Sequence, residues 1–159
     1  MKRSLVACLL CLVLFLVSGC GASIDYNAIY GDDAKIAGAA DSSFASTSIY
    51  NTIGDEMSMH AQAFVGAKTL WRYTADSDGE ITVSYSLSAS KGGKVKLVLI
   101  APDDAITILA EAAGGTSMDE MQSYTIGVQK GEYRIKVVGY EDPTFNLVLS
   151  AEVGKLVSK

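Results

Sequence analysis

The 159-residue sequence contains few of the residues that cross-link a fold or supply nucleophiles. It has three cysteines, two prolines and one histidine, and every cysteine lies within the first 20 residues. From Gly21 onwards the chain therefore has no thiol for a disulfide, a thiolate nucleophile or a cysteine-ligated metal. The G-x-S-x-G motif of many serine hydrolases is also absent. Nucleophilic hydrolysis would need a Ser-Lys or Ser-His pairing that no sequence motif indicates.

Residues 1–19 have the pattern of a secretory signal peptide. Two basic residues open the chain, residues 5–17 are an uncharged apolar run, and two small residues follow. A membrane-spanning helix needs about 18 to 20 apolar residues to cross roughly 30 Å of hydrocarbon, and this run is shorter. We therefore expect cleavage after residue 19. The C-x-x-C formed by Cys8 and Cys11 lies inside the signal and leaves with it, so it is not a redox motif.

The signal ends in Val17-Ser18-Gly19-Cys20. This tetrapeptide resembles the lipobox of bacterial lipoproteins, with valine at a position where leucine is more usual. The resemblance implies that Cys20 carries a diacylglyceryl group, is the first residue of the mature protein, and anchors it on the extracytoplasmic side of a membrane. Two acyl chains would hold far more firmly than one, at about 0.8 kcal/mol per buried CH₂. The alternatives are an ordinary signal peptide with an accidental cysteine, or an uncleaved anchor.

The mature chain from Cys20 to Lys159 is acidic. All 18 acidic residues lie after the signal, which gives these 140 residues a net charge near −7. Such a charge argues against the basic surface that nucleic-acid binding requires. It also argues against electrostatic attraction to anionic lipid or acidic polymers. The length suits one domain plus a tether.

The pattern of apolar residues changes near residue 55. Residues 20–55 are rich in alanine, serine, glycine and aspartate without a sustained period, which predicts a lipid-anchored, partly ordered tether. Residues 42–53 are expected to pack on the domain as a strand or a short helix. After residue 55 apolar and polar residues alternate, most clearly over 80–89, where serine and threonine occupy one face. A period of two is typical of a half-buried strand.

Eight segments after residue 55 have strand patterns. They are residues 57–65, 69–75, 80–89, 94–100, 105–112, 123–128, 132–138 and 145–149. Turns rich in glycine, aspartate or proline separate many of them, and only residues 116–121 could hold a helical turn. Short strands at this spacing predict an all-β fold, an antiparallel β-sandwich of jelly-roll-like form, as a single domain over residues 56–159.

Three stretches follow one another in a characteristic order: LWRYTA and GEITV within residues 70–83, VKLVLIAP at 95–102, and GEYRIKV with FNLVL within 131–149. This order resembles the bacterial pre-peptidase C-terminal domain, a small β-sandwich appended to secreted proteases and other exported enzymes. Lys94 and Lys96 stand where that family often has an acidic residue. The resemblance implies a noncatalytic domain that binds carbohydrate or polymer, or assists secretion.

The only histidine, His60, is isolated among candidate metal ligands. Strand alternation places it on the face opposite Met57 and Met59. A histidine without a second good ligand nearby makes a poor metal site. We therefore interpret His60 as a surface or satisfied polar residue.

Four other residues are candidate ligand contacts. Asp76 and Asp78 could contribute to a calcium site, because hard cations prefer clustered carboxylates, although a tight turn at Gly79 explains the same residues without metal. Tyr124 and Tyr140 could stack on sugars, because the other strand aromatics fall on the predicted core face. The alternative is that both tyrosines are ordinary rim residues.

Together these features predict a lipid-anchored, extracytoplasmic, noncatalytic binding or interaction module of the bacterial cell envelope. Its partners would be the membrane and an envelope protein or glycan, and no cofactor is expected. The alternatives are a structural envelope lipoprotein without a small ligand, and a carbohydrate- or calcium-binding accessory domain. An enzyme is expected only if the fold brings His60 within hydrogen-bond reach of a serine and a carboxylate.

Overall fold

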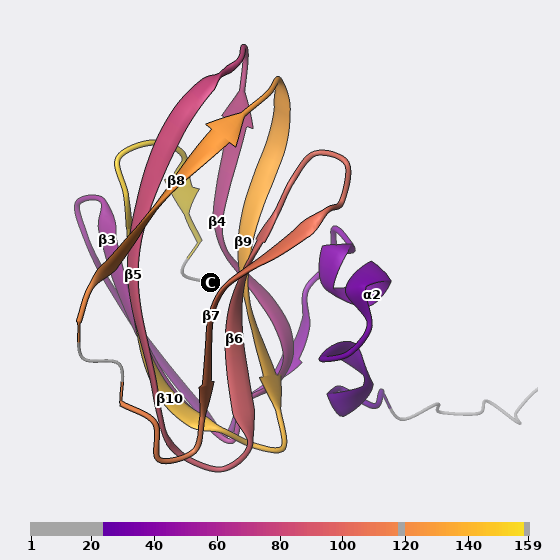
Figure 1. Ribbon diagram of the computed structural model, residues 1–159. Helices are drawn as coiled ribbons and strands as arrows, with labels where there is room; N and C mark the ends of the chain where they lie inside the picture. The colour runs from indigo at the N-terminus through magenta and orange to yellow at the C-terminus, as the bar shows by residue number, and fades with distance from the viewer. Residues whose placement is uncertain (1–23, 118–119, 158–159) are drawn as a thin grey trace, which may run out of the picture.

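The computed structural model describes residues 24–117 and 120–157, in which two antiparallel sheets pack face to face (Figure 1). Sheet A has the order β1 (Ser42–Phe44), β4 (Val65–Ala75), β9 (Gly131–Tyr140), β6 (Lys94–Ile100) and β7 (Ile106–Ala113), and β11 (Lys155–Leu156) also pairs with β4. Sheet B has the order β2 (Thr47–Ile53), β3 (Glu56–Gln62), β10 (Thr144–Ala151), β5 (Gly79–Lys91) and β8 (Gln122–Val128). Cys20 and the predicted signal peptide lie outside the described residues.

The strands predicted after residue 55 are all present, as β3 to β10. The prediction of an all-β antiparallel sandwich is therefore confirmed. Strand β5 shows the reason, because its odd-numbered residues from Ile81 to Ala89 are buried between the sheets while the serines and threonines between them face outward. A run with this alternation can bury its apolar side chains only as a strand with one solvated face.

The core between the sheets is built on large aromatic side chains. Trp71 and Phe145 are fully buried, and Phe64 meets the Phe145 ring edge-on with 5.5 Å between centroids. The buried indole of Trp71 donates a hydrogen bond of 2.7 Å from Nε1 to the carbonyl oxygen of Val153. This bond satisfies the one polar atom that the ring carries into the core.

An N-terminal layer, residues 24–41, covers the outer face of sheet A. It contains the 3₁₀ turn η1 (Asn27–Ile29) and the short helix α2 (Asp33–Ala37), and Figure 1 shows α2 beside β6 and β9. Ile29 and Ile36 are buried in a second cluster with four apolar residues of the sheet, Ala67, Val98, Ile100 and Val138. Residues 42–53, expected to pack on the domain, form β1 and β2, whereas residues 24–41, expected to belong to a partly ordered tether, are folded as the N-terminal layer.

Two further features of the described residues bear on the predictions. None of the helices in residues 24–117 and 120–157 has the length and apolar character needed to cross a bilayer. Within the predicted helical turn, Thr116 instead forms an isolated antiparallel bridge with Ala89, and residues 118–119 lie outside the description.

Candidate functional site

The two outer faces of the sandwich differ in whether a ligand can reach them. The outer face of sheet A carries basic side chains beneath the N-terminal layer, and the outer face of sheet B is open. The polar groups of the covered face are already occupied by the protein's own chain.

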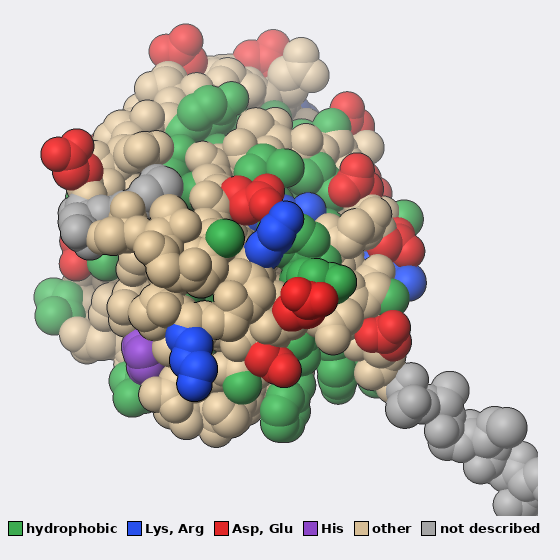
Figure 2. Space-filling view, turned by 60° about the horizontal axis from the view of Figure 1, so that its bottom comes forward, with side chains coloured by type: hydrophobic (Ala, Val, Ile, Leu, Met, Phe, Trp, Pro, Cys, Tyr) green, Lys and Arg blue, Asp and Glu red, His purple; other side chains and the backbone are tan. Residues whose placement is uncertain are grey.

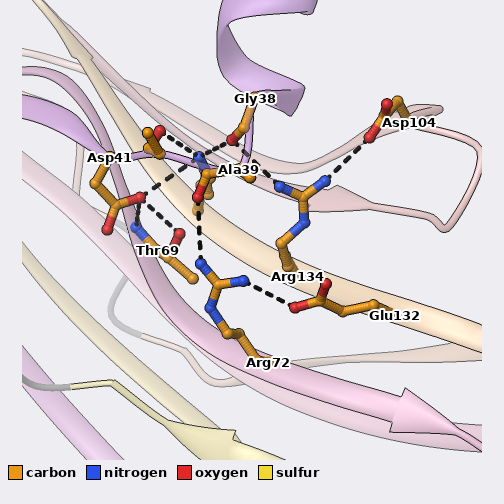
Figure 3. Close-up of polar contacts among 10 residues, drawn as sticks. Gly38, Ala39, Asp41, Thr69, Arg72, Asp104, Glu132 and Arg134 are labelled. Atoms are coloured by element: carbon orange, nitrogen blue, oxygen red, sulfur yellow. Dashed lines mark hydrogen bonds and ion pairs between the residues drawn. The ribbon is translucent and has the colours of Figure 1, made fainter.

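The buried ammonium of Lys136 on β9 attaches the N-terminal layer to sheet A. Its side chain is fully buried, and Nζ donates to the carbonyl oxygens of Gly38 at 2.7 Å and Ala40 at 3.3 Å (Figure 3). Nζ also lies 3.4 Å from the Asp41 carboxylate. Burial lowers the pKa of Lys136, and the nearby Asp41 carboxylate opposes that shift. The three oxygen partners offset the loss of water around the charge.

Two arginines and one aspartate complete this attachment. Arg134 donates to the Gly38 carbonyl at 3.2 Å and to Asp104 at 3.0 Å, while Arg72 bridges the Ala39 carbonyl and Glu132. Asp41 accepts from both the backbone N–H and the hydroxyl of Thr69, at 2.9 and 2.6 Å. We call Lys136, Arg134, Arg72 and the Asp41–Thr69 pair the clasp. The clasp directs these basic groups to the protein's own chain, so we do not regard the covered face as a ligand site.

The open face is the outward surface of sheet B. Its side chains follow from the strand register, because directly paired residues point to the same side. Three rows cross it: Ile49, His60, Asn146 and Ser88; Asn51, Ser58, Val148 and Ser86; and Ile53, Glu56, Ser150, Ser84 and Ser123. The face is therefore dominated by hydroxyl and amide groups.

The centre of the open face is a polar cluster around His60. The ring atom Nδ1 lies 2.8 Å from Asn146 Oδ1, and Nε2 lies 3.3 Å from the amide nitrogen of Gln62. A shallow hollow of about 300 Å³ lies here, lined by His60, Asn146, Ile49 and Val148 among others. Figure 2 shows the histidine, in purple, at the molecular surface. Within the described residues the ring's side-chain partners are amides and not the serine and carboxylate that a hydrolase would need.

Hydroxyl pairs extend this polar surface toward β8. Ser84 and Ser123 lie 2.8 Å apart between hydroxyl oxygens, and Thr82 and Thr125 lie 3.1 Å apart. Each hydroxyl can donate one hydrogen bond and accept two, so these pairs keep capacity for a ligand. Repeated hydroxyls on one face of a sheet can meet several polar groups of an extended molecule at once.

The structure separates the candidate ligand residues predicted from sequence. Asp76 and Asp78 are exposed in the turn between β4 and β5, and no group of three or more potential metal ligands occurs among the described residues. Tyr124 lies on β8 of sheet B and is 39% exposed. Tyr140 ends β9 of sheet A and packs on Tyr30, with ring centroids 5.6 Å apart. The two tyrosines share no surface, and their proposed role in sugar stacking stays a prediction.

Comparisons with known proteins give only distant structural similarity. Neither a protein-family model nor a curated protein matches the chain, so the resemblance to the pre-peptidase C-terminal domain also stays a prediction. A family 29 carbohydrate-binding module is similar with a TM-score of 0.40 and 15% identity, over 70% of this chain and 74% of the module. A variant of a family 29 module in complex with mannohexaose gives a TM-score of 0.39 and 14% identity, over 70% and 77%. A structure described as CBM4 gives 0.37 and 10%, over 74% and 79%. At TM-scores this low the similarities support no conclusion about a ligand.

Proposed function

We propose that the protein is a lipid-anchored, noncatalytic module that binds a neutral glycan on the open face of sheet B. The observation that carries the proposal is the chemistry of that face, where serine, asparagine and histidine side chains line the three rows and the Thr82–Thr125 pair lies beside them. These groups both donate and accept hydrogen bonds, as sugar hydroxyls do. A neutral polyol could therefore replace the water that now solvates them.

The charge distribution favours a neutral glycan over an acidic one. The carboxylates of the open face, Glu56 and Glu80, lie at strand ends, and the three rows that cross the face contain no lysine or arginine. An acidic polymer would meet repulsion there, which a neutral one would not. Ile49 and Val148 supply small apolar contacts beside the polar cluster, as is usual where sugar C–H groups must also be covered.

A lipid on Cys20 would orient this face away from the membrane. The described chain begins at Ile24, the first residue of the N-terminal layer, which lies on the side of sheet A. Four residues span at most about 14 Å when extended. The lipid would thus hold the N-terminal layer close to the bilayer, with sheet B on the opposite side of the sandwich and accessible to external polymers.

Affinity electrophoresis through gels containing a neutral glucan, a mannan or an acidic polysaccharide tests the proposal. We expect retardation of the full chain by at least one neutral polymer and none by the acidic one. Asn146→Ala removes a central amide and should weaken binding about five-fold, because one hydrogen bond contributes about 1 kcal/mol. Thr74→Ala, an exposed position on sheet A, should bind as the wild type does. Binding that survives Asn146→Ala unchanged, or is confined to the acidic polymer, would refute the proposal.

A further inference from the structure

Strand β2 is an unprotected edge of sheet B. Edge strands usually carry charges, prolines or bulges that discourage pairing with another chain. Thr47–Ile53 contains no charged residue and no proline, and its register with β3 is continuous. Ile49 and Ile53 are 60% and 72% exposed, although both are large apolar side chains. The strand thus offers free backbone groups together with apolar surface that a partner could bury.

The other edges offer less. Strand β8, at the opposite edge of sheet B, is also uncharged, but its outward side chains include Ser123 and Thr125, which are small and polar. Strand β7 at the edge of sheet A carries Glu111, and β1 has only three residues. Each of these three strands exposes one large apolar side chain, Tyr124 on β8, Ile108 on β7 and Phe44 on β1, whereas β2 exposes two isoleucines on one face.

We propose that β2 pairs antiparallel with β2 of a second copy of this chain, centred on Asn51. Ile49 and Ile53 lie four residues apart on one face, so this register places Ile49 of each copy opposite Ile53 of the other. Opposite side chains in antiparallel strands approach to about 5 Å between Cβ atoms, so each exposed isoleucine gains an apolar partner. The strand residues brought together are uncharged, and no like charges face one another.

The symmetry of this pairing agrees with the anchor, and this step rests on the proposed function. Two antiparallel strands of one continuous sheet are related by a twofold axis perpendicular to that sheet. Rotation about such an axis does not turn either sandwich over. Both N-terminal layers therefore remain on one side, where two lipids could enter one membrane, and both open faces lie together on the other. A closed twofold pair is also the commonest form of self-association, and two adjacent faces increase avidity for a long polymer.

Disulfide trapping in membranes that contain the full chain tests the pairing. Asn51→Cys places one thiol at the twofold axis, and oxidation with copper–phenanthroline should shift this variant to the mass of two copies on a non-reducing gel. Thr125→Cys is the matched control on the β8 edge, and the wild type shows any linkage through its own cysteines. Neither should form additional pairs. A single-copy mass for Asn51→Cys, equal trapping by Thr125→Cys, or a ladder beyond two copies would overturn the proposal.

A charge variant checks the register and separates this inference from the glycan proposal. Asn51→Lys brings two ammonium groups opposite each other, so the purified full chain in detergent should fall from two copies to one by native mass spectrometry. Retention of two copies would contradict the register.

Loss of glycan binding with intact trapping would refute the proposed ligand and leave the pairing standing. Glycan binding by a chain that never traps would refute the pairing alone.

Discussion

At the residue scale, the buried ammonium of Lys136 determines whether the N-terminal layer stays on sheet A. It donates hydrogen bonds to two carbonyl oxygens and forms an ion pair with one carboxylate. A buried polar group that loses its partner retains its desolvation penalty. The residues that face Lys136 therefore depend on it as much as it depends on them.

Lys136→Met keeps an unbranched side chain, one heavy atom shorter, and removes its charge. We expect a decrease of about 3 kcal/mol in the free energy of unfolding, because the carbonyls of Gly38 and Ala40 and the Asp41 carboxylate lose their cation. Urea denaturation measures the change, and hydrogen exchange should show lost protection in the N-terminal layer first. Lys130→Met, an exposed control in the turn before β9, should leave both unchanged. Equal stability of the two variants would contradict the role assigned to the clasp.

At the scale of elements, the strands were predictable from the sequence and the N-terminal layer was not. A period of two persists through β5 and identifies both of its faces. By contrast, η1 and α2 have three and five residues, which is too short for a helical period to emerge. Alternation places Lys136 on the outer side of β9, but only the folded chain shows that this side is covered.

The polar cluster of the open face also depends on contacts between distant parts of the sequence. His60 and Asn146 are 86 positions apart and meet through the register of β3 with β10. The alternation of apolar and polar residues correctly predicts that His60 points away from the buried methionines of its strand. No local signal indicates which strand lies beside it, so its amide partners could not be named from the sequence.

Ile36→Ala tests whether the N-terminal layer opens separately from the sandwich. Ile36 is fully buried between α2 and sheet A, and truncating such a side chain costs about 2 to 5 kcal/mol. We expect rapid hydrogen exchange in residues 29–37 while β5 and β10 stay protected, because the main core contains none of the atoms removed. Lys35→Ala, an exposed neighbour, provides the comparison. Simultaneous loss of protection in both sheets would show that the layer and the sandwich unfold as one unit.

At the scale of the whole molecule, alkaline pH should destabilise the fold. Burial raises the pKa of Tyr30, Tyr50 and Tyr85 above the ordinary value of 10.0. Their stabilising contribution is therefore complete below pH 10 and is lost as pH rises through their folded-state pKa values. Lys136, with its lowered pKa, shifts stability in the opposite direction, but it is one group against three buried tyrosines, and Glu141 also raises the pKa of Tyr140. Urea midpoints should fall above pH 10.

Tyr30→Phe provides the control for this pH dependence. The buried Tyr30 hydroxyl has no hydrogen-bond partner among the described residues, so its removal should leave neutral-pH stability equal or higher. The alkaline decrease should become shallower, because one of the raised pKa values is gone. An unchanged alkaline slope would show that Tyr30 is not the source of the effect.

The proposed location of the molecule at a membrane depends on Cys20. Cys20→Ala removes the thiol that a diacylglyceryl group would occupy, so we expect the protein to leave the lipid-anchored fraction, measured by phase partitioning in detergent and by labelling with a radioactive fatty acid. Cys11→Ala, inside the predicted signal, should leave labelling intact. Fatty-acid labelling that persists in Cys20→Ala would contradict the anchor.

The proposed function requires that the open face of sheet B binds a neutral glycan and that the covered face of sheet A does not. Its most direct test compares a lysine introduced on each face, Ser86→Lys in the middle of sheet B and Thr74→Lys on sheet A, by isothermal titration of the full chain with the neutral polymer that retards the wild type. We expect binding to be abolished by Ser86→Lys and unchanged by Thr74→Lys, with the same thermal unfolding in both. Undiminished binding by Ser86→Lys would contradict a glycan site on the open face of sheet B.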